Sequence, residues 1–231
     1  MKINRLTLVF SWSFPVLFFF LVSGCDKGKE IPEEVLDIDG NIYHTVTIGN
    51  QVWLVENFKS TKYNDGTSIP LVTGNTEWII LSTPGYCWYD NDIANRDTYG
   101  ALYNWYAVQT NKLCPTGWHV PSDEEWTALT DFLGGEATAG GKLKETGTVH
   151  WDSPNTGATN ESGFTSLPGG FRGAQGVCYY IGYWGQYWTS NSPFESVAYY
   201  RQMAADSEGV DNGKGNAIQR LCGLSVRCVM N

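Results

Sequence analysis

The chain has 231 residues, with 24 acidic and 15 basic side chains and a formal charge of −9 at pH 7. An acidic balance of this size argues against nucleic acid and against anionic lipid headgroups as electrostatic partners. The length is sufficient for one domain with a hydrophobic core.

The first 24 residues are predicted to be a lipoprotein signal peptide. Lys2 and Arg5 precede a largely apolar run, Leu6 to Val22, which ends in small residues directly before Cys25. Export signals have this order, and a cysteine at the cleavage point receives the lipid. A transmembrane helix with an incidental cysteine is the alternative, but the cationic start, the run length and the small residues favour cleavage. We therefore expect a lipidated Cys25 and a location in the bacterial cell envelope, at the outer membrane or the cell surface.

Residues 25–37 are predicted to form a flexible tether. They are charged, contain Pro32 and show no hydrophobic periodicity, which is typical of a linker. Residues 38–231 are then expected to form a single domain.

The first elements of this domain have clear local signals. Residues 42–48 and 51–55 alternate around Gly49-Asn50, a pattern that predicts a β-hairpin. Residues 99–108 (YGALYNWYAV) are predicted to form a short aromatic-rich helix, and 118–120 a short strand. Ser122 and Glu125 have the spacing of a capping box, so a helix is expected to begin there and to end at Gly134-Gly135.

The remaining chain is rich in glycine and aromatic residues. Glycine recurs every few residues between 134 and 176, where we expect long loops. Residues 187–190, 197–203 and 224–229 are predicted to be short antiparallel strands. Together the elements indicate one α+β domain of low helix content, with a core built around buried tryptophans.

Seven segments of the chain follow one another in a recognisable order. They are DGNIYHTVTIGNQVWLVENFKSTKYNDGTSIP (39–70), GYCWYDND (85–92), YGALYNWYAV (99–108), LCPTGWHVPSDEEW (113–126), GGKLKETGTVHW (140–151), NTGATNESGFTSLPGGFR (155–172) and GLSVRCV (223–229). In sequence and order they resemble the Fibrobacter succinogenes major paralogous domain, a family of secreted and lipid-anchored proteins. The likeness extends over nearly the whole chain after the tether, but it carries no established biochemical role.

This family has a more distant likeness to C-type lectin-like domains and formylglycine-generating enzymes. Here YNWYAV, GWHVPS and DEEW stand where that superfamily has an aromatic helix, a G-x-R-L-P-T strand and an E-A-E-W helix, and GLSVRC resembles its closing strand. The resemblance implies two short helices on small twisted antiparallel sheets with long loops, and paired N- and C-terminal strands.

Five cysteines remain after Cys25, so at least one is unpaired if disulfides form. Their spacing and the scattered histidines do not indicate a zinc site. The lectin-like resemblance implies that Cys114 pairs with Cys228. Cys178 with Cys222 would then be a second bridge, with Cys87 free.

An enzyme with thiol or metal chemistry is the alternative that the formylglycine-generating relatives suggest. Those enzymes use two closely spaced cysteines in a late loop, whereas here only Cys178 follows Pro168-Gly169-Gly170. A lone thiol cannot supply a two-cysteine metal site. The acidic residues are also too dispersed to nominate a glycosidase pair. No catalytic residue is therefore predicted.

Two loops are candidates for ligand binding. Residues 89–97 carry oxygen ligands that suit Ca²⁺, although turn-forming Asp and Asn without a metal are the commoner explanation. The calcium candidates are Asp90, Asn91, Asp92 and Asp97, with Asn95 nearby. In residues 176–191, exposed aromatic rings could stack on sugars, although most of the rings could instead fill the core. The ligand-contact candidates are Tyr183, Trp184, Gln186 and Asn191, whereas Trp188 is expected in the core.

The sequence thus predicts a lipid-anchored, non-catalytic surface module that binds glycan or protein through its loops. Calcium is the one cofactor considered. Besides the thiol or metal enzyme, a structural subunit of a surface assembly remains an alternative.

Overall fold

The computed structural model describes residues 31–213, 215 and 217–231. The predicted signal peptide and the lipidation site at Cys25 lie outside these residues. Within the described part, no helix is both long and apolar enough to cross a lipid bilayer. In chain order the elements are β1 (Glu34–Leu36), β2 (Ile42–Ile48), β3 (Gln51–Leu54), α1 (Asn75–Ile79), β4 (Tyr86–Cys87), the 3₁₀ turns η1 (Tyr89–Asn91) and η2 (Ile93–Asn95), α2 (Arg96–Tyr99), β5 (Leu102–Asn104), α3 (Trp105–Val108), β6 (Trp118–His119), α4 (Asp123–Phe132), α5 (Glu136–Leu143), β7 (Gly169–Arg172), β8 (Cys178–Ile181), β9 (Trp184–Trp188), β10 (Val197–Ala198), β11 (Tyr200–Ala204), β12 (Ile218–Gln219), β13 (Gly223–Leu224) and β14 (Val229–Met230).

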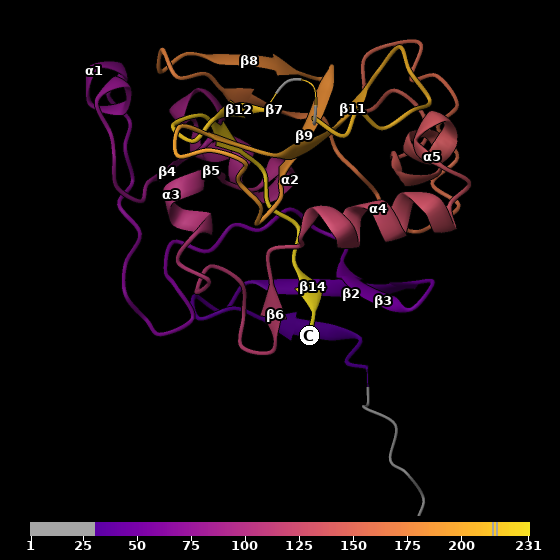
Figure 1. Cartoon of the computed structure of the whole chain (residues 1–231), viewed down its shortest axis with the longest axis horizontal. Helices are drawn as coiled ribbons and strands as arrows, with labels where there is room; N and C mark the ends of the chain where they lie inside the picture. The colour runs from indigo at the N-terminus through magenta and orange to yellow at the C-terminus, as the bar shows by residue number, and fades with distance from the viewer. Residues whose placement is uncertain (1–30, 214, 216) are drawn as a thin grey trace, which may run out of the picture. The chain divides into compact units, whose positions relative to one another are not determined.

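A five-stranded lower sheet has the order β1-β2-β3-β14-β6 (Figure 1). The predicted hairpin forms its centre, and Gly49 takes a positive φ of 61° in the turn where Ile48 pairs with Gln51. The C-terminal strand β14 lies between β3 and β6, with Val229 paired to both Trp53 and His119. The expected pairing of N- and C-terminal strands is therefore confirmed.

An upper sheet contains β11, β9, β7, β13, β5 and β4 in that order, and β8 adds to β7. Figure 1 shows it above α4, on the far side of that helix from β2 and β3. The predicted C-terminal strands are found but are shorter and interrupted. In particular, residues 224–229 do not form one strand, because β13 belongs to the upper sheet and β14 to the lower sheet. The chain between them joins the two sheets.

Helix α4 packs between the two sheets. Its capping box is present as predicted, with Ser122 Oγ accepting from Glu125 N at 3.2 Å and Glu125 Oε2 accepting from Ser122 N at 2.7 Å. Trp126 of this helix contacts Trp53 of the lower sheet and Tyr187 of the upper sheet, with ring centroids 4.9 and 5.7 Å apart. The helix thus buries a continuous aromatic core between the layers.

The core is pinned by tryptophans, as expected. The fully buried ones are Trp53, Trp78, Trp126, Trp151 and Trp188. Helices and antiparallel strands are mixed throughout the described chain, so the prediction of an α+β fold is confirmed.

The predicted helix over 99–108 is wrong in its first half. Tyr99 ends the preceding helix α2, Leu102 to Asn104 form β5, which pairs with β4 and β13, and the helix α3 contains only Trp105 to Val108. Asn104 decides the boundary, because its extended backbone ends the strand while its side chain accepts from Ala107 N at 3.1 Å and caps α3.

The glycine-rich segment 134–176 is not loop throughout, since it contains α5. Gly140 and Gly141 are buried in this helix. A Cβ atom on Gly140 would lie 2.1 Å from Gly209 O, and a Cβ atom on Gly141 would lie 2.3 Å from Gly157 O. The two glycines are therefore needed for close contact with neighbouring backbone.

The flexible tether predicted for 25–37 is wrong at its end. Glu34 to Leu36 form β1, Val35 pairs with Tyr43, and Asp37 accepts a 2.7 Å hydrogen bond from the Tyr43 hydroxyl. The ordered domain therefore begins before residue 38.

Candidate functional site

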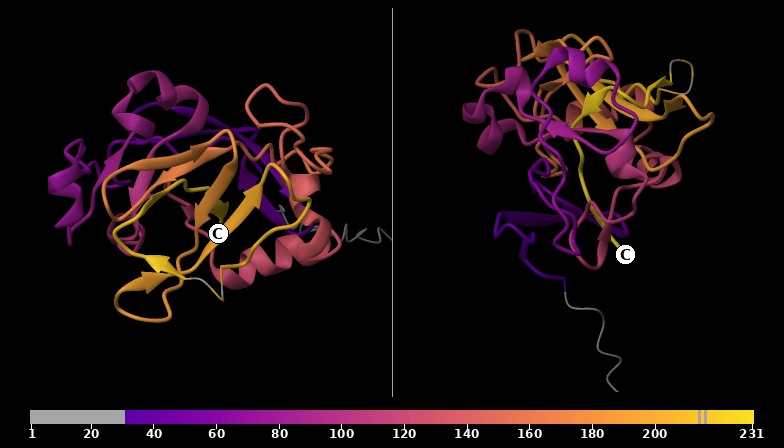
Figure 2. Two further views of the ribbon diagram at one scale, coloured as in Figure 1. Left: turned by 90° about the horizontal axis from the view of Figure 1, so that it is seen from above. Right: turned by 90° about the vertical axis from the view of Figure 1, so that its left-hand side faces the viewer.

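A cluster of five aromatic rings lies on the strands β7, β8 and β9 and on the turn between β8 and β9. Figures 1 and 2 show these strands on the side of the domain that faces away from β2 and β3. The cluster, called the aromatic platform below, consists of Phe171, Tyr179, Tyr180, Tyr183 and Trp184.

The rings of the platform contact one another but are not enclosed by the core. Tyr180 and Trp184 are closest, with ring centroids 3.9 Å apart, and Phe171 is stacked at 8° to Tyr180. Tyr179 and Tyr180 are 38% and 49% exposed, and the other three rings are half-buried. Several aromatic faces are thus held in fixed positions at the surface.

The local sequence explains how the platform is built. Strand β8 pairs with β7 so that Tyr179 lies opposite Phe171. The chain then reverses through Gly182, whose φ is 83°, and Tyr183 N donates to Tyr180 O at 3.1 Å. Tyr180 itself has a φ of 63°, a conformation that is costly for an aromatic residue and is retained only where its surroundings require it.

Two carboxylates lie beside one end of the platform. The Tyr183 hydroxyl hydrogen bonds to Asp206, which together with burial and the charges of Asp206 and Asp152 raises the pKa of Tyr183 above its usual value. The Asp152 carboxylate lies against the backbone of Gly182, and Asp152 N donates to Gly182 O at 2.7 Å. The platform therefore combines apolar ring faces with hydrogen-bond acceptors.

Two of the four predicted ligand residues belong to this platform, namely Tyr183 and Trp184. Trp188 is in the core, as expected. Gln186 is only 3% exposed and donates to Gln202 inside the sheet, so its prediction as a ligand residue is wrong. Asn191 accepts from Asp123 N at the start of α4 and is not part of the platform.

Sequence reasoning missed Phe171, Tyr179 and Tyr180 as members of the platform. Tyr179 and Tyr180 belong to the aromatic run of the sequence. Their position just before Gly182, where the chain can reverse, is the sequence signal that could have placed them beside Tyr183 and Trp184. Phe171 could not be found in this way, because only the pairing of β7 with β8 brings it to Tyr179.

The acidic loop does not gather its oxygen atoms around one point. Asp92 accepts from Ala94 N at 2.9 Å and Asp97 forms an ion pair with Lys59 at 3.3 Å. Asp90 and Asn91 have φ values of 51° and 57°, so they occupy a left-handed turn that Asp and Asn tolerate. Among the residues described, no three His, Cys, Asp or Glu side chains are grouped to hold a metal ion. Calcium binding at Asp90, Asn91, Asp92 and Asp97 stays a prediction without geometric support.

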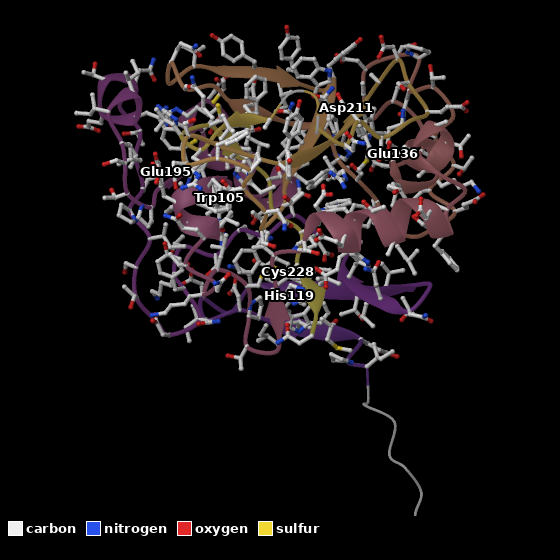
Figure 3. All side chains as sticks on the ribbon, in the orientation of Figure 1. Trp105, His119, Glu136, Glu195, Asp211 and Cys228 are labelled. Atoms are coloured by element: carbon white, nitrogen blue, oxygen red, sulfur yellow. A yellow bond between two sulfur atoms is a disulfide. The ribbon has the colours of Figure 1, made fainter. Side chains whose placement is uncertain are left out.

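The cysteines are arranged differently from part of the prediction. Cys114 and Cys228 form a disulfide with a Cα–Cα distance of 6.0 Å, as implied by the lectin-like resemblance. Figure 3 shows Cys228 beside His119, at the position where β14 pairs with β6. The predicted Cys178–Cys222 bridge is wrong, since both cysteines are free. The reason is that β8 places Cys178 opposite Arg172 and in the apolar cluster of Cys87, whereas Cys222 packs in another cluster.

A concave surface is also found away from the platform. A hollow of about 340 Å³ lies between the β2–β3 turn and α4, where exposed Phe132 covers Gly49. It is open to solvent and is bordered by the ion pair of Lys142 and Glu161. The hollow shares no residue with the platform and presents no comparable group of rings, so the platform is the stronger candidate for ligand binding.

A comparison with known families decides the relationship that the seven segments suggested. The family model described as Fibrobacter succinogenes major domain (Fib_succ_major) matches residues 46–230. The chain belongs to this family. No curated protein and no solved structure matches the sequence.

The Fibrobacter succinogenes major domain of this chain contains the entire aromatic platform. The match begins within β2 and ends with β14, so it includes the upper sheet, the lower sheet apart from β1 and the start of β2, and the Cys114–Cys228 disulfide. Strand β1 precedes the matched residues but pairs with β2. The ordered structure therefore extends beyond the N-terminal limit of the family match.

Proposed function

We propose that this protein is a lipid-anchored, non-catalytic module of the bacterial envelope that binds glycans through the aromatic platform. The observation that carries the proposal is the group of five mutually contacting, partly exposed rings beside Asp152 and Asp206. Exposed aromatic patches on soluble domains are commonly binding surfaces. Flat apolar ring faces suit the C–H faces of sugar rings, and neighbouring acceptors suit sugar hydroxyls.

The anchor follows from the N-terminal sequence. A cationic start, an apolar run and small residues before Cys25 support lipid attachment at that cysteine. Incorporation of a labelled palmitate analogue tests this part of the proposal, and full labelling of a Cys25→Ser variant would contradict it.

A C-type lectin-like fold is part of the proposal. Its support comes from small antiparallel sheets around short helices, from the pairing of β14 with β3, and from a disulfide between the residue directly before β14 and the region before α4. A fold alone does not transmit a function, so the glycan proposal depends on the platform.

Binding to soluble polysaccharides and to a glycan array tests the platform. Trp184→Ala and Tyr183→Ala should each weaken affinity for a bound glycan about fivefold, since one aromatic contact contributes about 1 kcal/mol. Phe132→Ala is the matched control, because Phe132 is an exposed ring outside the platform and its removal should leave affinity unchanged. Circular dichroism verifies that each variant is folded.

Two results would overturn the glycan proposal. One is background binding to every glycan by the folded wild-type protein. The other is a bound glycan whose affinity is unaffected by both platform substitutions. A stable protein partner retained by wild type but lost in Trp184→Ala would instead assign the platform to protein binding.

A further inference from the structure

Two free cysteines from distant parts of the sequence lie in one apolar cluster, next to the strand β8 that carries Tyr179 and Tyr180 of the aromatic platform. Cys87 ends β4 and Cys178 begins β8, and both belong to one apolar cluster with Trp78 and Leu102. The two side chains are neighbours in this cluster, and their interaction moves the pKa values of the two thiols in opposite directions. Cys87 is fully buried, whereas Cys178 is partly exposed. Solvent and small reagents can therefore reach only one member of the pair directly.

The surroundings of Cys178 favour negative charge on its sulfur. Asp90 N lies 3.3 Å from Cys178 Sγ and donates to it. The interaction with Cys87, the hydrogen bond from Asp90 N and the charge of Arg172 together outweigh burial and lower the pKa of Cys178. The same contact with Cys178 and complete burial raise the pKa of Cys87. The pair is thus divided into an accessible thiol of lowered pKa and a buried thiol of raised pKa.

Arg172 supplies a buried positive charge at this place. Its side chain is fully buried, stacks on Trp78 at 4.3 Å and donates to the carbonyl oxygens of Val72, Thr73 and Gly176. No carboxylate among the described residues forms an ion pair with it. Since an unpaired buried charge is unfavourable, a thiolate at the adjacent cysteine pair would provide a compensating negative charge.

We infer that Cys178 and Cys87 form a redox-active dithiol pair, in which Cys178 is the attacking thiolate and Cys87 is the resolving thiol. The oxidant is a disulfide, either a small molecule such as glutathione disulfide or an exposed protein disulfide. The inference depends neither on the lipid anchor nor on glycan binding.

The reaction balances in two exchange steps. The Cys178 thiolate attacks one sulfur of the oxidant, forms a mixed disulfide and releases the other sulfur as a thiolate. Cys87 then loses its proton, attacks the Cys178 sulfur and releases the second thiolate. The proton of Cys87 and the proton that Cys178 had given up to solvent are taken up by the two released thiolates, so one disulfide is reduced to two thiols as Cys87 and Cys178 become a disulfide. The new bond would connect β4 with β8, the strand that carries Tyr179 and Tyr180.

Alkylation of the full chain tests the first step. The folded protein is treated with iodoacetamide near neutral pH, and the labelled cysteines are identified by peptide mass spectrometry. Cys178 should react at least about tenfold faster than Cys222, because burial raises the pKa of Cys222 to about 11 and leaves little thiolate. Equal rates at the two cysteines would overturn the assignment of Cys178 as the attacking group.

Equilibration with mixtures of reduced and oxidised glutathione tests the complete pair. Peptides linking Cys87 to Cys178 should appear with increasing glutathione disulfide and disappear again on reduction of the native protein. Cys87→Ser should accumulate a glutathione mixed disulfide at Cys178, whereas Cys178→Ser should leave Cys87 unmodified. Cys222→Ser is the matched control and should behave as wild type. Two results would overturn the inference. One is that the folded wild-type protein does not form the link, and the other is that reduced glutathione cannot break the link while the protein is folded.

Discussion

Lys144 and Arg227 are fully buried side chains whose hydrogen-bond acceptors are largely backbone carbonyl oxygens. Lys144 Nζ donates to the carbonyls of Thr156, Ala204 and Ser207 at 2.7 to 2.9 Å. Arg227 donates to three further carbonyls and to Asn57. Buried backbone carbonyl oxygens of the long loops thus accept hydrogen bonds from these two cations. Sequence alone could not identify these cations, because each acceptor lies far away along the chain or has no side-chain signal.

His119 illustrates a residue whose charge affects stability. Its Nε2 lies 2.8 Å from Glu125 Oε1, and this hydrogen bond raises the pKa of His119 despite partial burial. Burial would raise the pKa of Glu125, but the hydrogen bond from His119 and that from Ser122 lower it overall. The contribution of His119 is therefore fully present below its unfolded pKa of about 6.5 and lost as pH rises through its folded pKa. That of Glu125 is lost in acid, as pH falls through its lowered pKa.

His119→Gln should therefore destabilise the protein more at about pH 5 than at about pH 9. We expect the difference to stay below about 1 kcal/mol, since both side chains are partly exposed and solvent screens the pair. Urea denaturation of wild type and variant at the two pH values measures it. An equal loss of unfolding free energy at both pH values would show that the imidazolium charge contributes nothing.

At the scale of elements, the accuracy of the sequence prediction depends on how local the signals are. Helix α4 and the β2–β3 hairpin could be predicted because Ser122, Glu125 and Gly49 determine the backbone only within a few residues of their own positions. Strand β5 and helix α5 were missed because their determinants are distant. β5 is fixed by pairing with β4 and β13, and α5 by close packing on residues 157 and 209. The platform follows the same rule, since Phe171 joins it only through strand pairing.

Helix α5 gives the clearest test of such a distant determinant. Alanine is a better helix former than glycine, so Gly141→Ala would stabilise an isolated helix by about 1 kcal/mol. In this domain the new methyl group would meet the Gly157 carbonyl at 2.3 Å. We therefore expect Gly141→Ala to lower the free energy of unfolding by at least about 2 kcal/mol, as overpacking does.

Thr138→Ala on the same helix is the matched control for Gly141→Ala. Thr138 is exposed, so its substitution should be neutral or slightly stabilising through helix propensity alone. Thermal and urea denaturation of both variants provide the comparison. A Gly141→Ala variant as stable as wild type would mean that the backbone at Gly157 moves away without cost.

At the scale of the whole domain, the two sheets are joined through the C-terminal segment. β13 pairs with β5 and β7 in the upper sheet, and β14 pairs with β3 and β6 in the lower sheet. Arg227 lies buried between these strands, over the rings of Phe164 and Tyr187. The sequence could indicate a closing strand here but not its division, because each half is defined by partners more than 50 residues away.

The Cys114–Cys228 disulfide secures this arrangement by linking the residue directly before the last strand to a cysteine 114 residues earlier. By the chain-entropy account, a crosslink closing so long a segment stabilises the folded state by about 5 kcal/mol, because it restricts the unfolded chain. The double variant Cys114→Ala/Cys228→Ala should lose roughly that amount in urea denaturation without reductant. Its m value should rise, since the uncrosslinked chain exposes more surface on unfolding.

Cys222→Ala is the control, because Cys222 is also buried but is not in a disulfide. This substitution should cost only about 1 kcal/mol and leave m unchanged. Equal losses in the two variants, with no change in m, would show that the sheets are held together by packing and that the bridge adds nothing beyond its two buried side chains.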